Sequence, residues 1–152
     1  MLKLQGVMPA LVTPYDAKGA IDFVAFEKHL TALRAAGVSG WVPCGSSGEY
    51  NLMTDAERDA VLRFVKDHAL PHETLIAGTN APSTAGTIAN TRRAQEMGYH
   101  AVLLAVPFYT KPTQAEIIHH FKDTRAGGII FYRINFESPQ QIKKFISDLE
   151  TA

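Results

Sequence analysis

Short apolar segments alternate with amphipathic segments along the chain, and this alternation limits the possible folds more than any other feature. Five such pairs follow one another at spacings of about 27 to 34 residues, which is the size of a βα repeat. The expected strands are 7–12, 40–43, 74–78, 101–106 and 129–134. The segment 101–106 is entirely apolar, as expected of a parallel strand that is covered on both faces. The pattern therefore predicts a single α/β domain over 1–152 with a mainly parallel sheet.

Helix-start signals lie between the expected strands and support the same alternation. A side chain that can accept hydrogen bonds from the first free N–H groups of a helix precedes four of the amphipathic segments. These caps are Asp22, Thr54 paired with Glu57, Ser83, and Thr113 paired with Glu116. Each predicted strand up to 101–106 is thus followed by a segment that is expected to start as a helix.

Composition and charge limit the classes of partner. The chain has 152 residues with 15 basic and 15 acidic side chains, and this balance gives no sign of binding to nucleic acid or to an anionic membrane. No apolar segment approaches the roughly 18 residues of a membrane-spanning helix, and residues 1–6 do not resemble a signal peptide. The single cysteine, Cys44, excludes an internal disulfide and suits a reducing compartment. We expect a cytoplasmic protein without nucleic-acid or membrane partners.

Residue types that often carry catalysis or bind metals lack supporting partners here. Cys44 stands at the end of an expected strand with no histidine motif near it, which favours a small buried residue over a nucleophile. His119 and His120 are adjacent, and adjacent residues of a helix do not share a face. We therefore expect no metal site and no cofactor.

The turn after the second expected strand is the strongest candidate for a binding site. Gly45 and Gly48 bracket the two hydroxyl residues Ser46 and Ser47, and the carboxylate of Glu49 follows. Glycines let the backbone come close to a ligand, while backbone N–H groups and hydroxyls donate hydrogen bonds to an anion. We call this segment the 45–49 turn, and its composition predicts a site for a small anion at the carboxyl end of a strand.

Several short motifs occur in one order along the first 123 residues or so. They are LVTPY at 11–15, GSSGE at 45–49 with TDAER at 54–58, IAGTN at 76–80, and VPFYTKPTQ at 106–114. In sequence and spacing this part of the chain resembles the amino-terminal part of the dihydrodipicolinate synthase/N-acetylneuraminate lyase family of class I aldolases. The resemblance implies a TIM barrel, frequent assembly as dimers of dimers, and chemistry that begins with pyruvate or another 2-oxo acid.

The same resemblance implies roles for individual residues. Ser46 and Ser47, with the backbone of the 45–49 turn, would hold the carboxylate of pyruvate, and Tyr109 would join Ser46 in a proton relay. In the stretch 131–138 only Tyr132 matches the family pattern, where a tyrosine acts as proton shuttle. The expected catalytic residues are thus Tyr132, Tyr109 and Ser46, and the expected substrate-binding residues are Ser46, Ser47, Gly45 and Gly48.

A class I aldolase also needs a lysine that forms a Schiff base with the ketone. The resemblance places this lysine about one βα unit after the tyrosine of the fifth strand, and no lysine of this sequence matches that position. Lys143 and Lys144 fall on the last amphipathic segment, where a solvated face is expected. The first interpretation is an aldolase-derived scaffold or chimera without lyase activity, with βα units 1–4 over 1–123 and a divergent fifth unit over 124–152. The alternatives are a class I aldolase that acts on pyruvate and a weak binder of 2-oxo acid carboxylates.

Two architectures suit five βα units. One is a partial TIM barrel that is completed by self-association, since neighbouring strands of this family pair in sequence order. The other is a five-stranded, doubly wound sheet of the flavodoxin-like kind, which buries both faces of the sheet within one chain. The order of the strands distinguishes the two.

Overall fold

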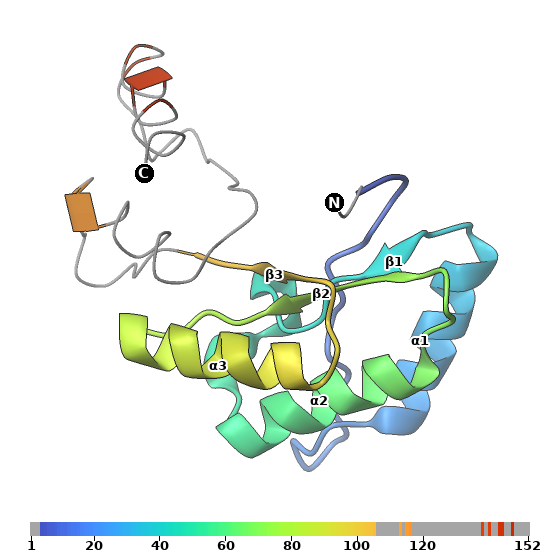
Figure 1. Cartoon of the computed structure of the whole chain (residues 1–152). Coiled ribbons are helices and arrows are strands. Elements are labelled where there is room, and N and C mark those ends of the chain that lie inside the picture. The colour runs from blue at the N-terminus through green and yellow to red at the C-terminus, as the bar shows by residue number, and fades with distance from the viewer. Residues whose placement is uncertain are drawn as a thin grey trace.

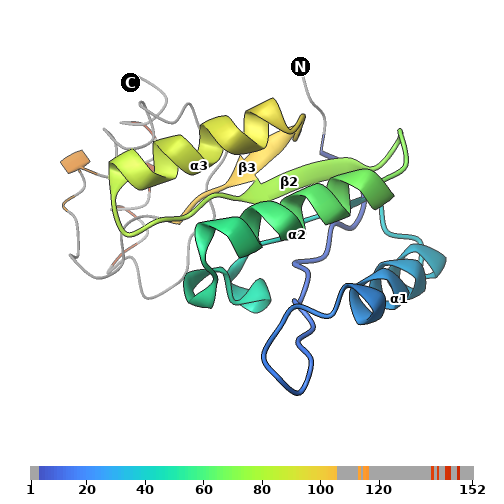
Figure 2. The same cartoon turned by 90° about the horizontal axis from the view of Figure 1, so that it is seen from below.

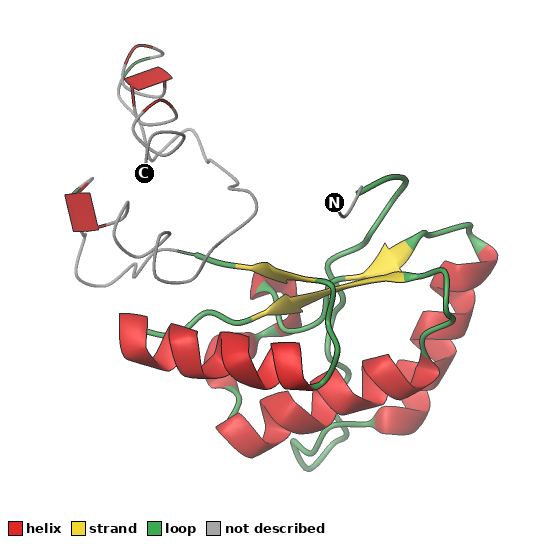
Figure 3. Cartoon of the chain, in the orientation of Figure 1, coloured by secondary structure: helices red, strands yellow, loops and turns green. Residues whose placement is uncertain are grey.

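Three helices pack against a parallel sheet in the computed structural model of the chain (Figure 1), which describes residues 4–105, 113, 115, 116, 138, 140, 143, 144 and 147. The helices are α1 (Phe23–Ala35), α2 (Asp55–His68) and α3 (Thr84–Glu96), and the strands are β1 (Gly40–Trp41), β2 (Thr74–Gly78) and β3 (Ala101–Leu103). Two short 3-10 turns, η1 (Ser46–Gly48) and η2 (Tyr50–Leu52), lie between β1 and α2. The described part therefore has the predicted α/β alternation, which Figure 3 shows by colour.

The described strands pair in the order in which they occur in the sequence. β1 pairs in parallel with β2, with Trp41 opposite Leu75, and β2 pairs in parallel with β3. Segment 7–11 extends the sheet beside β1 through the parallel bridge between Ala10 and Val42 and three backbone hydrogen bonds of 2.8 to 3.1 Å. In a flavodoxin-like order of 2-1-3-4-5 the third strand would pair with the first. The doubly wound alternative is therefore wrong for the described strands.

The helices confirm this conclusion by their position. Figure 1 shows α1, α2 and α3 on the same side of the strands, and Figure 2 shows the same layers from below. A doubly wound sheet has helices on both faces, whereas consecutive barrel strands have them on one. All three residues of β3 are half-buried, so the expectation of a strand covered on both faces is not met for them. Helices in the described part cover only one face.

The predicted caps start the helices where the sequence places them. The Asp22 carboxylate accepts a hydrogen bond from the N–H of Ala25 at 2.9 Å, and Thr54 and Glu57 form a reciprocal capping box. Ser83 caps α3 by accepting from Gly86 at 3.1 Å. The Thr113 hydroxyl and the Glu116 carboxylate show the same reciprocal contacts. These contacts are local along the chain, which is why the sequence predicts them well.

The core lies between the sheet and the helices and encloses the carboxylate of Glu73. Trp41, at 0% exposed, is a core residue, and its indole N–H donates to the Glu73 carboxylate at 2.7 Å. Glu73 is only 2% exposed and also accepts two hydrogen bonds from the Arg34 guanidinium, at 2.8 and 3.0 Å. A buried carboxylate needs partners of this kind to offset its loss of hydration.

The remaining expectations about the fold concern residues that the structure does not describe. They are Val106, the strand 129–134, and the proposed boundary between units 1–123 and 124–152. The predicted strand 101–106 is shorter in the described part, where β3 ends at Leu103. Among the described helices, none has the length and apolar character needed to cross a membrane.

Candidate functional site

The 45–49 turn lies at the carboxyl end of β1, as the sequence predicts. Its core is η1, closed by a hydrogen bond of 3.0 Å from the Gly48 N–H to the Gly45 carbonyl and one of 3.1 Å from the Glu49 N–H to the Ser46 carbonyl. Cys44 and Glu49 flank η1 with φ values of 57° and 59°. Left-handed conformations are unfavourable for residues other than glycine. The tertiary structure therefore imposes the shape of this turn on both sides.

Ser46, Ser47 and Glu49 of the turn are exposed, whereas both glycines are buried. Within residues 4–105 no acceptor is found for the backbone N–H or the hydroxyl of Ser46 or Ser47. A side chain at Gly48 would place its Cβ 2.9 Å from the Leu11 carbonyl oxygen, closer than Cβ atoms normally come. The turn thus presents free donors to solvent on a backbone that is packed closely from behind, which is the arrangement of an anion site.

Contacts from the neighbouring strands hold the turn in place. The Thr13 hydroxyl, from the end of the first strand segment, donates to the Gly48 carbonyl at 2.9 Å. On the other side, the Gly78 N–H at the end of β2 donates to the Pro43 carbonyl at 2.9 Å. A Cβ at Gly78 would overlap the Cys44 carbonyl oxygen. These contacts explain why a glycine ends β2 at this point.

Cys44 is a buried residue, as expected. It is 0% exposed, and burial raises the pKa of its thiol to about 12, although the nearby Arg58 guanidinium lowers it slightly. Its Sγ lies 3.9 Å from the Arg58 carbonyl oxygen. A neutral, enclosed thiol is a poor nucleophile. Cys44 therefore belongs to the packing behind the turn.

The other predicted site residues are only partly within the described structure. Tyr109 and Tyr132 lie outside it, so the proton relay stays a prediction. The lysines that the structure does describe are all exposed: Lys18, Lys28, Lys66, Lys143 and Lys144. A Schiff-base lysine is usually activated by desolvation or by a neighbouring cation. None of these five has the desolvated environment.

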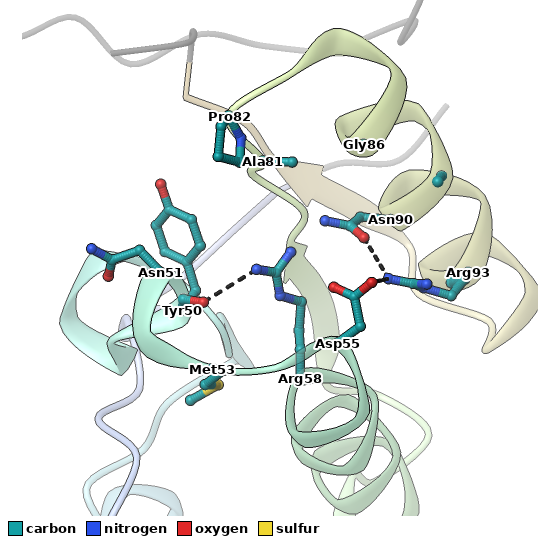
Figure 4. A pocket seen from close by; sticks show the side chains of 11 residues that line it. Tyr50, Asn51, Met53, Asp55, Arg58, Ala81, Pro82, Gly86, Asn90 and Arg93 are labelled. Atoms are coloured by element: carbon teal, nitrogen blue, oxygen red, sulfur yellow. Dashed lines mark hydrogen bonds and ion pairs between the residues drawn. The ribbon is translucent and has the colours of Figure 1, made fainter. Parts of the chain in front are cut away.

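A hollow of about 450 Å³ lies between η2, the start of α2, the loop after β2, and α3 (Figure 4). Arg93 lies 3.4 Å from a carboxylate oxygen of Asp55 and 3.4 Å from one of Asp59, and it donates to the Asn90 side chain at 2.6 Å. The charged groups at this hollow thus largely pair with one another. No local sequence pattern predicts this hollow, because its lining comes from four separate segments.

Arg58, on α2, is the residue of functional interest that the sequence analysis missed. Its guanidinium is buried and contacts the residue that follows the 45–49 turn. Two signals were present in the sequence: its place in the motif 54–58, and its spacing of three and seven residues to Val61 and Val65 on the buried stripe of α2. They were outweighed because an arginine in an amphipathic helix normally indicates a solvated face. No three histidine, cysteine or acidic side chains in the described part of the chain are grouped so as to hold a metal ion.

Comparison with known proteins shows which family the chain is similar to. The model of the dihydrodipicolinate synthetase family matches residues 3–147. This match continues past residue 123, where the recognisable motifs end. A curated relative, 4-hydroxy-tetrahydrodipicolinate synthase of Bdellovibrio bacteriovorus, is 38% identical over 122 residues, which are 80% of this chain and 41% of that protein.

Solved structures show the same similarity in three dimensions. The dihydrodipicolinate synthase of Acinetobacter baumannii, solved in complex with pyruvate, has a TM-score of 0.78 at 32% identity, over 81% of this chain and 42% of that one. The 4-hydroxy-tetrahydrodipicolinate synthase of Methylacidiphilum fumariolicum has a TM-score of 0.82 at 27% identity, over 99% of this chain and 52% of that one. The chain spans less than half the length of the curated relatives that it matches.

Proposed function

Because the chain belongs to the dihydrodipicolinate synthetase family, we propose that its 45–49 turn binds the carboxylate of pyruvate or another 2-oxo acid. The observation that carries the proposal is the pair of exposed serines, Ser46 and Ser47, whose N–H groups have no acceptor within residues 4–105. Hydrogen bonds from such donors to a carboxylate are charge-assisted and are each worth about 1.5 to 3 kcal/mol. Two or three of them suit a dissociation constant in the millimolar range, which corresponds to about 4 kcal/mol.

Binding of the substrate carboxylate by the turn is one of the functions that aldolase chemistry requires. It would fix the carboxylate and so orient the adjacent ketone, while Tyr109 and Tyr132 would move protons at the reacting carbon, as the family resemblance implies. Attack on the ketone requires a lysine in an environment that favours its neutral form. Every described lysine is exposed. We therefore propose that these 152 residues by themselves form an aldolase-derived scaffold that binds the acid without lyase activity.

The origin of segment 124–152 bears on this proposal. A foreign or redesigned fifth unit would explain why only Tyr132 matches the family pattern there. The family match through residue 147 favours a family origin for most of this segment instead. The proposed scaffold role does not depend on which origin is correct.

Self-association is part of the proposal as well. Segment 7–11 pairs with β1 on one side, and no other strand of the described residues pairs with its second side. Val7 and Val12 in this part of the chain are 66% and 47% exposed. An open sheet edge with exposed apolar side chains favours association with another strand. We expect a dimer or larger homo-oligomer by light scattering, and a strictly monomeric chain would contradict this part of the proposal.

Titration with pyruvate, followed by amide NMR, tests the binding site. We expect the Ser46 and Ser47 amide signals to shift in a saturable way at millimolar pyruvate, and a double substitution of Ser46 and Ser47 by alanine to weaken the response. Thr31→Ala, on the exposed face of α1, is the matched control and should leave the affinity unchanged. Signals of the turn that do not move at millimolar pyruvate would remove the proposed function.

Class I aldolase activity is the second candidate, and the identity of 38% to a 4-hydroxy-tetrahydrodipicolinate synthase favours it. Borohydride reduction in the presence of pyruvate, followed by mass spectrometry, distinguishes the two candidates. The scaffold proposal predicts an unmodified chain. A stable pyruvyl adduct on a single lysine would establish the aldolase instead.

A further inference from the structure

Arg58 is a buried cation that pairs with no anionic side chain in the part of the chain that the structure describes. The residue is 6% exposed, and its guanidinium forms no ion pair with any carboxylate among the described residues. Its two terminal nitrogens donate instead to backbone carbonyl oxygens. One bond of 2.9 Å goes to Asn80, and one of 3.1 Å goes to Tyr50, which Figure 4 shows. The guanidinium also lies 5.6 Å from the centre of the Tyr50 ring. Burying a charge costs several kcal/mol, so a fixed position of this side chain needs compensation of this kind.

The two carbonyl groups belong to different loops at the carboxyl edge of the sheet. Tyr50 directly follows the 45–49 turn, and Asn80 directly follows the end of β2. A guanidinium presents its donors as a rigid planar fork, which a lysine cannot reproduce. Because each terminal nitrogen of the guanidinium holds one of these carbonyl groups, Arg58 fixes the end of the turn relative to the loop after β2.

Asn80 extends this connection to the next strand. Its backbone carbonyl also accepts from the Asn90 side chain at 3.4 Å, and its side-chain oxygen accepts from the N–H of Ala105, beyond β3. Asn80 is 3% exposed and Asn90 is 6% exposed. The hydrogen bonds of this network hold the loop after β2 to α2, α3 and the segment beyond β3, although the buried Nε of Arg58 has no partner among the described residues. Arg58 is the member that joins the network to the 45–49 turn.

The charge of Arg58 also acts on the turn. It lowers the pKa of both Cys44 and Tyr50, against the larger raising effect of burial on each. These two residues stand immediately before and after the 45–49 turn. No lysine or arginine side chain occurs within the turn itself. A positive charge behind the turn favours an anion in front of it, because low-dielectric surroundings screen the charge less than water does.

We propose that Arg58 is a positioning residue for the 45–49 turn, which it clamps to the loop after β2 while it supplies the positive charge that favours a carboxylate there. The carboxylate part rests on the proposed function, whereas the clamp part concerns the free protein. The two parts predict different measurements.

Hydrogen exchange in the free protein tests the clamp. In Arg58→Met the amides of Gly48 and Glu49, which close η1, should exchange about tenfold faster relative to the amides of α1, which corresponds to the loss of about 1.4 kcal/mol of local stability. Arg58→Lys should show a similar increase, since it lacks the fork. Arg63→Met changes an exposed arginine of the same helix and should leave both rates unchanged. Unchanged exchange at Gly48 and Glu49 in Arg58→Lys would overturn the clamp, including when Arg58→Met fails to fold.

Pyruvate titration of the same variants tests the charge. We expect the dissociation constant to rise about fivefold to tenfold in Arg58→Met and by a smaller factor in Arg58→Lys, which keeps the charge. Equal affinity in all variants would overturn the electrostatic part. If the unmodified chain does not respond to pyruvate, the proposed function and the electrostatic part fail together, and the exchange rates still decide the clamp.

Discussion

The hydroxyl of Thr13 donates a hydrogen bond of 2.9 Å to the carbonyl oxygen of Gly48, a residue 35 positions further along the chain. Thr13 is 6% exposed and Gly48 is buried, so water does not readily replace either partner. The bond connects the end of the first strand segment to the middle of the 45–49 turn. The position of the two exposed serines thus depends on packing between separate βα units.

Thr13→Val should destabilise the protein, because it replaces a buried hydroxyl by a methyl group and leaves the Gly48 carbonyl without a donor. The expected loss is about 1 to 3 kcal/mol of unfolding free energy, measured by urea denaturation. Thr31→Val is the matched control. Thr31 donates to a carbonyl within its own helix at an exposed site, and its substitution should cost less than about 0.5 kcal/mol. Equal losses of unfolding free energy in the two variants would show that the Thr13 hydrogen bond stabilises the protein no more than the exposed Thr31 hydrogen bond does.

Gly78→Ala should displace the turn, because the new Cβ would overlap the Cys44 carbonyl oxygen. Overpacking of this kind typically costs about 1 to 3 kcal/mol, and the turn amides should shift in an NMR spectrum of the free protein. Gly45→Ala is the steric control for stability, because its Cβ would meet only Leu103 at an ordinary 3.7 Å. A Gly78→Ala variant as stable as the unmodified chain, with unchanged turn signals, would contradict this prediction.

Glu73 should make the stability of the protein depend on acidic pH. Burial alone would raise the pKa of its carboxyl, but hydrogen bonds from Arg34, the Leu70 N–H and Trp41 together lower the pKa from 4.5 to about 2. A lowered pKa in the folded state stabilises the protein above the pKa of the unfolded chain, and this contribution is lost as the pH falls from about 4.5 to 2.

Glu73→Gln should therefore be less stable than the unmodified chain near pH 7, by about 1 to 3 kcal/mol. The difference should shrink steadily as the pH falls from 4.5 toward 2. Urea midpoints over this pH range measure it, with Glu27→Gln as a control at an exposed carboxylate. A difference between the unmodified chain and Glu73→Gln that does not vary with pH would contradict the assignment of the effect to ionised Glu73.

Cys44 should resist thiol reagents as long as the protein is folded. Its thiol is buried, and the pKa is raised to about 12, so the reactive thiolate is scarce at pH 8. We expect labelling to be on the order of 100-fold slower than in concentrated urea. Since Cys44 is the only cysteine, labelling at one site reports the opening of this region directly. Fast labelling of the native chain would indicate an accessible turn.

Local signals account for the parts of the structure that the sequence predicted well. α1 and α2 begin directly after Asp22 and Thr54 because a cap and its helix lie within three residues of each other. β2 has the predicted bounds of Thr74–Gly78, since apolar residues and flanking turn residues define it locally. The predicted strand 40–43 is shorter in the structure, where β1 covers Gly40–Trp41 and Val42 forms only a bridge. The 45–49 turn was recognisable because two glycines and two serines are adjacent in the chain.

The sequence by itself thus determined the helices, the alternation and the turn, whereas only the tertiary structure decided the strand order and the partners of Arg58. Helical periodicity places Arg58 on the buried stripe of α2 with Val61 and Val65, but it does not show what would offset the cost of burying a lone cation. Carbonyl groups of Tyr50 and Asn80, 8 positions before it and 22 after it, reduce that cost only when the two loops meet. Contacts of this kind depend on the folding of several units together, and no local pattern in the chain contains them.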